Sequence, residues 1–173
     1  MTVSAKQVMD LRAATGMPMM KCKKALEAED GDYEKAVERL RKEGLKAADV
    51  RADRTTAQGL VRVRICDETN HGHLIGVSCE TEPVANTPMF VEFVDQLVEH
   101  VVAKKPSSIE ELMGQNWILD ESSTVEEVLR GLIARIGENM KVPAIDRVAP
   151  DGPGLVSSYV HFHKRPGALL ALS

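Results

Sequence analysis

Apolar side chains recur at helical spacing in three short runs within the first 44 residues. Thr15-Gly16 and Asp30-Gly31 separate the runs, and we expect Gly44 to end the third, because glycine readily adopts the backbone conformation that closes a helix. Each run has one narrow apolar face, so helices of this length are stable only when those faces share a core. The pattern therefore predicts a three-helix head over residues 1–50.

The spacing of apolar residues changes after a polar, alanine-containing linker at residues 51–58. Branched apolar side chains alternate with Arg62 and Arg64 between residues 59 and 66, which is the pattern of a strand with one face in water. A second short apolar segment follows at residues 74–79. Because only a turn separates the two segments, we expect them to form a hairpin.

Two longer helices and three more strands are predicted beyond this hairpin. Thr87-Pro88 begins a helix that we expect to end before Pro106, and Thr124 begins another with the spacing of a capping box. Short strands are expected over residues 140–148, 155–162 and 168–172. Strands joined by such short turns pair antiparallel, so residues 59–173 are predicted to form an α+β core, with an antiparallel sheet and helices packed on one of its faces.

Composition favours a globular protein that does not bind nucleic acid directly. The formal net charge is -4, so the chain lacks the broad positive field that attracts phosphate backbones, and the 3% of aromatic residues provide no platform for stacked bases. No apolar window of about 18 residues suggests a membrane span. The first ten residues include Lys6 and Asp10 in place of an apolar signal region, so we expect a cytoplasmic protein.

The residues offer little for catalysis or for metal binding. GxSxG, HExxH and phosphate-binding glycine motifs are missing from the sequence, and its three cysteines fit neither a disulfide framework nor a CxxC metal site. His71-x-His73 and His161-x-His163 each place two imidazoles on one side of a strand, a spacing that can hold Zn²⁺. We expect no enzyme activity, no cofactor and no metal, and a His-ligated metal-binding protein is one alternative.

The segment at residues 11–26, LRAATGMPMMKCKKAL, resembles the N-terminal signature of the elongation factor Ts family. Other segments that resemble the family follow in its order. They are Gly44–Ala48, Cys79–Ala85, Ile136–Asn139, Tyr159–His161 and Gly167–Leu172. The resemblance thus extends over nearly the whole chain.

This resemblance implies a guanine-nucleotide exchange factor that binds the GTPase elongation factor Tu and performs no chemistry itself. It implies that residues 1–50 form a ubiquitin-associated-like head that docks on the GTPase, and that the core is also a dimerisation domain, because short members with one core lobe are expected to form homodimers. In the family, a loop beside the Mg²⁺ and phosphates of the GTPase promotes GDP release. By position, that exchange loop is Thr81, Glu82, Pro83 and Val84.

The exchange loop departs from the usual Thr-Asp-Phe-Val of the family. Glu82 keeps a negative charge, but Pro83 replaces the aromatic residue that wedges between helices of the partner. Proline fixes its own φ and favours an extended residue before it, so we expect a stiff tip with Glu82 extended. Met89 or Phe90, a few residues on, are candidates for an auxiliary wedge.

The resemblance also assigns a partner-binding surface to the head. Its residues are Arg12, Thr15, Gly16, Met17, Met19, Met20 and Lys23. Periodicity alone favours the head core for the three methionines, although we expect Met19 to belong partly to the core and partly to the surface. Lys23 fits a solvated helix face. The partner is expected to be elongation factor Tu in its nucleotide-free state. A ubiquitin-associated-type adaptor without exchange activity is the other alternative.

Overall fold

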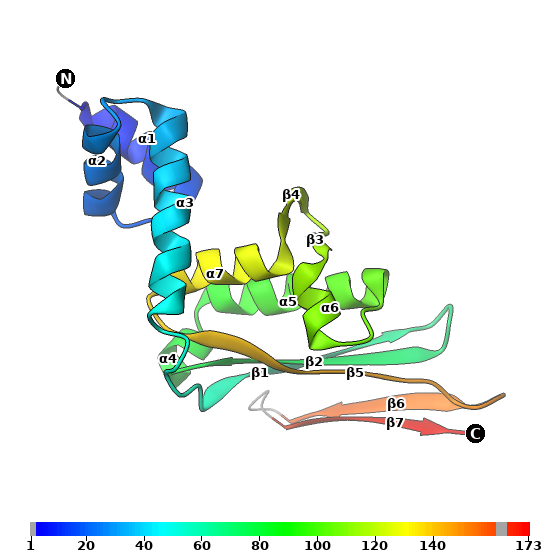
Figure 1. Cartoon of the computed structure of the whole chain (residues 1–173). Coiled ribbons are helices and arrows are strands. Elements are labelled where there is room, and N and C mark those ends of the chain that lie inside the picture. The colour runs from blue at the N-terminus through cyan, green and yellow to red at the C-terminus, as the bar shows by residue number, and fades with distance from the viewer. Residues whose placement is uncertain (1–2, 162–165) are drawn as a thin grey trace. The chain divides into compact units, whose positions relative to one another are not determined.

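The computed structural model describes residues 3–161 and 166–173 and has an α+β fold (Figure 1). An N-terminal helical region is followed by a core with antiparallel sheets, which confirms the predicted fold class. The chain divides into two compact units, one formed by Met1–Asp53 with Leu129–Gly137 and the other by Arg54–Val128 with Glu138–Ser173. In the described ranges, every helix is too short or too polar to cross a membrane.

The first unit contains three helices, α1 (Ala5–Thr15), α2 (Met19–Ala28) and α3 (Tyr33–Asp49). The first begins at a capping box, in which Ser4 Oγ accepts a hydrogen bond from the backbone N–H of Gln7 at 3.2 Å and Gln7 Oε1 accepts one from Ser4 N–H at 2.9 Å. The helices share one core, as expected. Its buried members are Val8, Leu11, Met17, Cys22, Ala25, Leu26, Ala36, Leu40 and Ala134.

Helix α3 does not end at Gly44, so that expectation was wrong. The helix continues to Asp49, and Gly44 is buried within it. A Cβ at Gly44 would lie 3.1 Å from the Cβ of Ala134, a residue of α7 (Val125–Ile136). Gly44 thus serves close helix packing instead of capping. Arg51, just after α3, donates hydrogen bonds to the carbonyl oxygens of Ala47 at 2.6 Å and Gly137 at 3.0 Å.

The second unit is organised around a three-stranded antiparallel sheet in the order β1-β2-β5. Its strands are β1 (Gln58–Cys66), β2 (His71–Cys79) and β5 (Met140–Val148). Between β2 and β5 the chain forms α4 (Glu82–Ala85), α5 (Pro88–Lys104), α6 (Ile109–Gly114), the short strands β3 (Asn116–Trp117) and β4 (Asp120–Thr124), and α7. The strands β6 (Leu155–Val160) and β7 (Gly167–Leu172) pair with each other in a separate hairpin.

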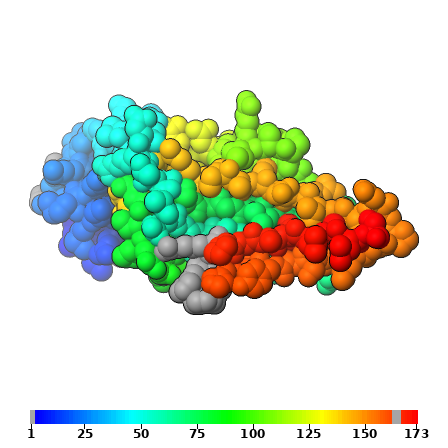
Figure 2. Space-filling view, turned by 90° about the horizontal axis from the view of Figure 1, so that it is seen from below, coloured from blue at the N-terminus to red at the C-terminus, as the bar shows by residue number. Residues whose placement is uncertain are grey.

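The two faces of the β1-β2-β5 sheet have different covers. Helix α5 covers one face, where Arg62 pairs with Asp95 at 2.5 Å and Arg64 pairs with Glu99. The Arg64 side chain is still 54% exposed, as expected for a strand face in water, whereas the Arg62 side chain is only 19% exposed because it packs beside α5. The hairpin of β6 and β7 covers the other face (Figures 1 and 2). A Cβ at Gly72 would lie 2.8 Å from Leu169 Cδ2 and 2.9 Å from Val156 Cγ1, so side chains of the hairpin pack closely over Gly72.

The core beneath α5 contains a stack of three rings. Trp117 lies between Phe93 and His100, with ring centroids 5.9 Å and 5.4 Å away. His100 is fully buried, and its Nε2 lies 3.0 Å from Gln115 Oε1, while its Nδ1 has no hydrogen-bond partner among the described residues. Burial lowers the pKa of His100, because a charged imidazole is poorly solvated there. The pKa of His73, also buried, is lowered for the same reason.

This burial predicts a loss of stability in mild acid. Below the ordinary histidine pKa of about 6.5, His73 and His100 bind protons in the unfolded chain but not in the folded chain. The free energy of unfolding therefore decreases as the pH falls below that pKa, and it keeps its full value above it. Urea unfolding followed by the fluorescence of Trp117 at pH 7.5 and 5.5 measures the effect. We expect His100→Phe to reduce the pH dependence. Equal pH dependence in wild type and His100→Phe would contradict this reading.

Candidate functional site

The predicted exchange loop lies between β2 and α5. Residues Glu82–Ala85 form the single helical turn α4, with Pro83 in its first turn, so the expected extended conformation of Glu82 was wrong. Thr81, which is extended, precedes the turn, and its carbonyl accepts from Ala85 N–H at 3.2 Å. A proline at the start of a helix sacrifices no intrahelical hydrogen bond, so the turn tolerates Pro83.

Side chains that follow the turn close it. Asn86 Nδ2 donates to the carbonyl oxygen of Glu82 at 3.0 Å, and Thr87 Oγ1 donates to that of Val84 at 2.8 Å. Thr87 also caps α5 by accepting from Phe90 N–H at 3.4 Å. The loop is therefore a compact element joined directly to the long helix.

A carboxylate from a distant part of the chain holds the start of the loop. Glu138 accepts from the backbone N–H of Thr81 at 3.0 Å and from its hydroxyl at 2.6 Å. These bonds join two of the segments that carry the family resemblance, residues 79–85 and 136–139. A single residue thereby fixes both the backbone and the side chain of Thr81.

Glu80 and Asn139 reinforce this attachment. Glu80 Oε1 accepts from Asn139 N–H at 2.6 Å and from Arg54 Nη1 at 3.3 Å. Asn139 is 2% exposed, and its Nδ2 donates to the carbonyl oxygen of Arg54 at 2.8 Å. Sequence reasoning did not select Glu80, Glu138 or Asn139 as site residues. They lie in the recognised segments, but their role becomes visible only when those segments are brought together.

The tip of the loop faces solvent. Thr81, Glu82 and Pro83 are exposed, Val84 is half-buried and Ala85 is buried. The side chains available to a partner are therefore one carboxylate and one compact apolar ring. Such a tip can bring negative charge close to a partner surface, with little apolar reach.

The two candidates for an auxiliary wedge differ in exposure. Met89 is 36% exposed, whereas Phe90 is 0% exposed and belongs to the core under α5. Phe90 thus has no surface to offer a partner in this structure, and its selection as a wedge was wrong. The helical spacing of Phe90 with Val94 and Leu97 already favoured a core position.

A network of hydrogen bonds and sulfur contacts shapes the turn between α1 and α2. Gly16 ends α1 with φ 66°, and its N–H donates to the carbonyl oxygen of Arg12 at 2.8 Å. Thr15 Oγ1 donates to the carbonyl oxygen of Leu11 at 2.7 Å and lies 3.8 Å from Cys22 Sγ. Cys22 Sγ in turn donates to the carbonyl oxygen of Met17 at 3.5 Å. These contacts connect the end of α1 to the start of α2.

The structure separates the three head methionines. Met17 is 4% exposed and lies in the head core, whereas Met19 is 46% exposed and Met20 is 61% exposed. Arg12 and Lys23 are also exposed, and Lys23 Nζ lies 3.6 Å from Glu27 Oε1. The preference of periodicity for the core is correct for Met17 and wrong for Met20, whereas Met19, which was expected to be partly core and partly surface, is about half exposed. The predicted head residues therefore divide into a buried support and an exposed surface.

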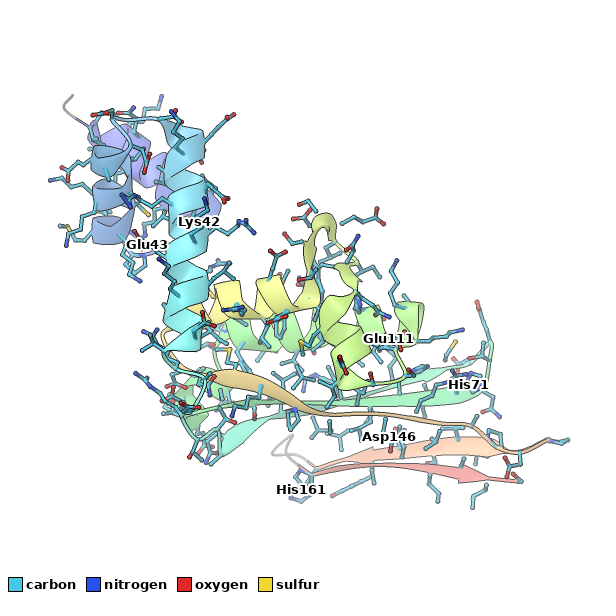
Figure 3. All side chains as sticks on the ribbon, viewed as in Figure 1. Lys42, Glu43, His71, Glu111, Asp146 and His161 are labelled. Atoms are coloured by element: carbon cyan, nitrogen blue, oxygen red, sulfur yellow. The ribbon has the colours of Figure 1, made fainter. Side chains whose placement is uncertain are left out.

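Among the described residues, two histidines of the metal-binding alternative, His71 and His161, have partners other than a metal site. His71 nitrogens lie 3.2 Å and 3.3 Å from Arg147 Nη2, and His161 Nδ1 lies 2.6 Å from the Tyr159 hydroxyl. His71 and His161 lie far apart along the strands (Figure 3). His163 is outside the described residues. Over residues 3–161 and 166–173, the side chains of His, Cys, Asp and Glu form no group of three suited to a metal ion.

Comparisons with known proteins agree with the resemblance seen in the sequence. The family model described as elongation factor TS matches residues 80–173. Elongation factor Ts of Trichlorobacter lovleyi is 44% identical over 170 residues, which cover 98% of this chain and 54% of that protein. Elongation factor Ts of Clostridium novyi is 42% identical over 170 residues, with 98% of this chain and 55% of that protein covered. The chain spans about half the length of these curated relatives.

The attachment of the exchange loop by Glu138 can be tested by hydrogen exchange. Glu138→Ala removes both acceptors of Thr81, so the Thr81 amide should exchange about tenfold faster or more, as expected for loss of a charge-assisted hydrogen bond. Glu138→Gln keeps one carbonyl acceptor and should restore part of the protection. Glu121→Ala, at an exposed carboxylate of β4, is the matched control. Unchanged Thr81 exchange in Glu138→Ala would show that the loop does not depend on this contact.

Proposed function

The chain belongs to the elongation factor Ts family, and we propose that it promotes release of GDP from the GTPase elongation factor Tu. The supporting observation is the exchange loop, whose exposed Glu82 and Pro83 stand on a turn fixed by Glu138. The activity is one of binding, without a chemical step or a cofactor of its own. The proposed place of action is the cytoplasm, where translation takes place.

The proposed mechanism acts on the Mg²⁺ and phosphate region of the GTPase. Nucleotide affinity in a GTPase depends on Mg²⁺ that bridges the phosphates and on backbone N–H groups that surround them. The carboxylate of Glu82, brought beside this region, competes electrostatically with the phosphates for the metal ion. A protein that binds the empty GTPase more tightly than the loaded one weakens nucleotide binding by the same factor, because the two equilibria are linked.

The fixed shape of the loop favours this mechanism. A mobile loop would lose conformational entropy on binding, and that loss would reduce the affinity for the empty GTPase. The hydrogen bonds from Thr81 to Glu138 and from Asn139 to Glu80 and Arg54 restrict the loop before it meets a partner. More of the interaction free energy is then available to weaken nucleotide binding.

We propose separate tasks for the parts of the chain. Residues 1–50 form the head that docks on the GTPase, residues 51–58 link it to the rest, and residues 59–173 form the core that carries the exchange loop. In the head, exposed Met19 and Met20 supply apolar contact, with Arg12 and Lys23 beside them in sequence on α1 and α2. Met17 supports the turn from the head core, while half-buried Thr15 and exposed Gly16 form the turn itself.

We also propose that two copies associate through the core. The hairpin of β6 and β7 exposes an apolar surface, with Leu155 and Tyr159 60% exposed and Leu170 and Leu172 54% exposed. The register pairs Leu155 with Leu172, and all four residues lie on one side of the hairpin. An exposed apolar surface of this kind favours association with another protein surface. A second copy would bring a second core lobe to the complex.

A pull-down with nucleotide-free elongation factor Tu tests the proposed function. The GTPase should bind the immobilised protein when empty and dissociate when GDP is added, because the two ligands compete through linkage. A ubiquitin-associated-type adaptor would show no such competition. Binding that is indifferent to GDP would refute the exchange function.

Glu82→Ala should slow GDP release without preventing docking. Removing the carboxylate should reduce the release rate at saturating protein by about tenfold, a factor that corresponds to about 1.4 kcal/mol of lost charge interaction. The concentration for half-maximal stimulation should change little. Stopped-flow release of labelled GDP measures both quantities, with Glu121→Ala as the control. A normal rate for Glu82→Ala would exclude this carboxylate from the mechanism.

Met20→Ser should change the concentration for half-maximal stimulation and leave the release rate at saturation nearly unchanged. Loss of apolar contact at an exposed docking residue should raise the concentration for half-maximal stimulation by about tenfold. The release rate at saturation should remain close to that of wild type, because the exchange loop is intact. The same titration with labelled GDP measures it. Met9→Ser, at another methionine that is 61% exposed, is the matched control.

Leu170→Glu should prevent association of two copies. A charge on the exposed apolar side of the hairpin would have to be buried in the dimer, at a large cost in free energy. Light scattering after size-exclusion chromatography should give a dimer for wild type and a monomer for Leu170→Glu. A wild-type monomer at tens of micromolar would contradict the proposed dimer.

A further inference from the structure

The side chain of Arg135 lies directly over Gly16 in the turn between α1 and α2. A Cβ at Gly16 would be 2.3 Å from Arg135 Nε, 2.4 Å from Nη2 and 2.6 Å from Cζ. The guanidinium therefore occupies the space that a side chain at residue 16 would take. Arg135 belongs to the last turn of α7, and both residues are in the same compact unit. A residue distant in sequence thus contributes to the surface of the head turn.

Gly16 is suited to this arrangement in two ways. Its φ of 66° lies in the left-handed region, where glycine is favoured, and the missing side chain admits the planar guanidinium. Arginine presents its donors in a rigid, planar group, so contact with the backbone limits the directions in which those donors point. The guanidinium of Arg135 therefore packs against the backbone of the turn at Gly16.

The charge of Arg135 is not neutralised within the described chain. Arg135 is exposed, and no carboxylate in residues 3–161 or 166–173 forms an ion pair with it. Arg130, on the same helix, differs, because it pairs with Asp49 and donates to the carbonyl oxygen of Leu45 at 3.2 Å. Arg130 joins α7 to α3, whereas Arg135 keeps donors available to solvent.

The surroundings of Arg135 make this charge useful for recognition. The turn that it covers begins after Arg12 and leads to the exposed side chains of Met19 and Met20. The guanidinium lies over Gly16, shortly before exposed Met19 and Met20 in the sequence, and this combination matches a partner surface that carries a carboxylate beside an apolar patch. A charge-assisted, bidentate arginine contact adds both affinity and orientation to such an interface.

We propose that Arg135 is part of the docking surface of the head and binds a carboxylate of the partner GTPase. This inference rests on the proposed function. It adds a residue from α7 to a surface that the sequence placed wholly within the first 23 residues. The contact contributes to docking and leaves the rate of the docked complex unchanged.

Three substitutions of Arg135 separate recognition from mere support of the turn. Arg135→Lys keeps the charge, Arg135→Ala removes it and Arg135→Glu reverses it. Lys42→Glu is the matched control, because it makes the same change in charge on α3 at a side chain that is 67% exposed. GDP release from elongation factor Tu is titrated with each full-length variant at 50 mM and 300 mM salt. Circular dichroism verifies that the helices are retained.

The concentration for half-maximal stimulation should rise about tenfold for Arg135→Ala at low salt, more for Arg135→Glu and less for Arg135→Lys. The rate at saturation should not change, and high salt should reduce the differences. Lys42→Glu should stay within about threefold of wild type.

Equal effects of Arg135→Ala, Arg135→Glu and Arg135→Lys would overturn the proposal, since a purely structural role is indifferent to the sign of the charge. Normal docking by Arg135→Glu would also overturn it. If wild type itself fails to accelerate release at any concentration, the proposed function fails and this inference fails with it.

Discussion

The carboxylate of Glu138 accepts two hydrogen bonds from Thr81 and so anchors the start of the exchange loop. A single helical turn such as α4 is not stable alone, because it orders several residues for very few hydrogen bonds. The contacts of Glu138, together with those of Glu80 and Asn139, supply the missing restraint. The exposed tip formed by Glu82 and Pro83 therefore depends on residues more than fifty positions away in the sequence. Its proposed action on a GTPase depends on the same restraint.

Local patterns in the sequence predicted those elements of the fold whose stability is decided locally. The capping box at Ser4 and the N-cap at Asp32 mark helix starts because their side chains bond to nearby backbone groups. Gly44 was misinterpreted because close packing against Ala134 is a tertiary effect. The ion pairs of Arg62 and Arg64 with carboxylates of α5 could not be predicted for the same reason.

The candidate site shows the same division between local and distant effects. The resemblance assigns the exchange loop and the head turn to continuous segments of the sequence, and these assignments remain predictions. It did not reveal that Glu138 holds Thr81 or that Arg135 covers Gly16, since these contacts join residues far apart in sequence. Phe90 was selected for its place after the loop, although burial beneath α5 excludes it from the surface. The helical spacing of Phe90 with Val94 and Leu97 already indicated a position in the core.

The most direct test of the account is the rate of GDP dissociation from elongation factor Tu at saturating concentration of the purified protein. Linkage predicts that the bound protein weakens nucleotide binding, typically by about 5- to 150-fold. We expect this loss of affinity to appear as faster dissociation of GDP. GTP release should accelerate by a similar factor, because the protein is proposed to act on the phosphates and Mg²⁺ that both nucleotides share. An unchanged rate of GDP dissociation would contradict the central claim that this protein binds its GTPase best when the nucleotide site is empty.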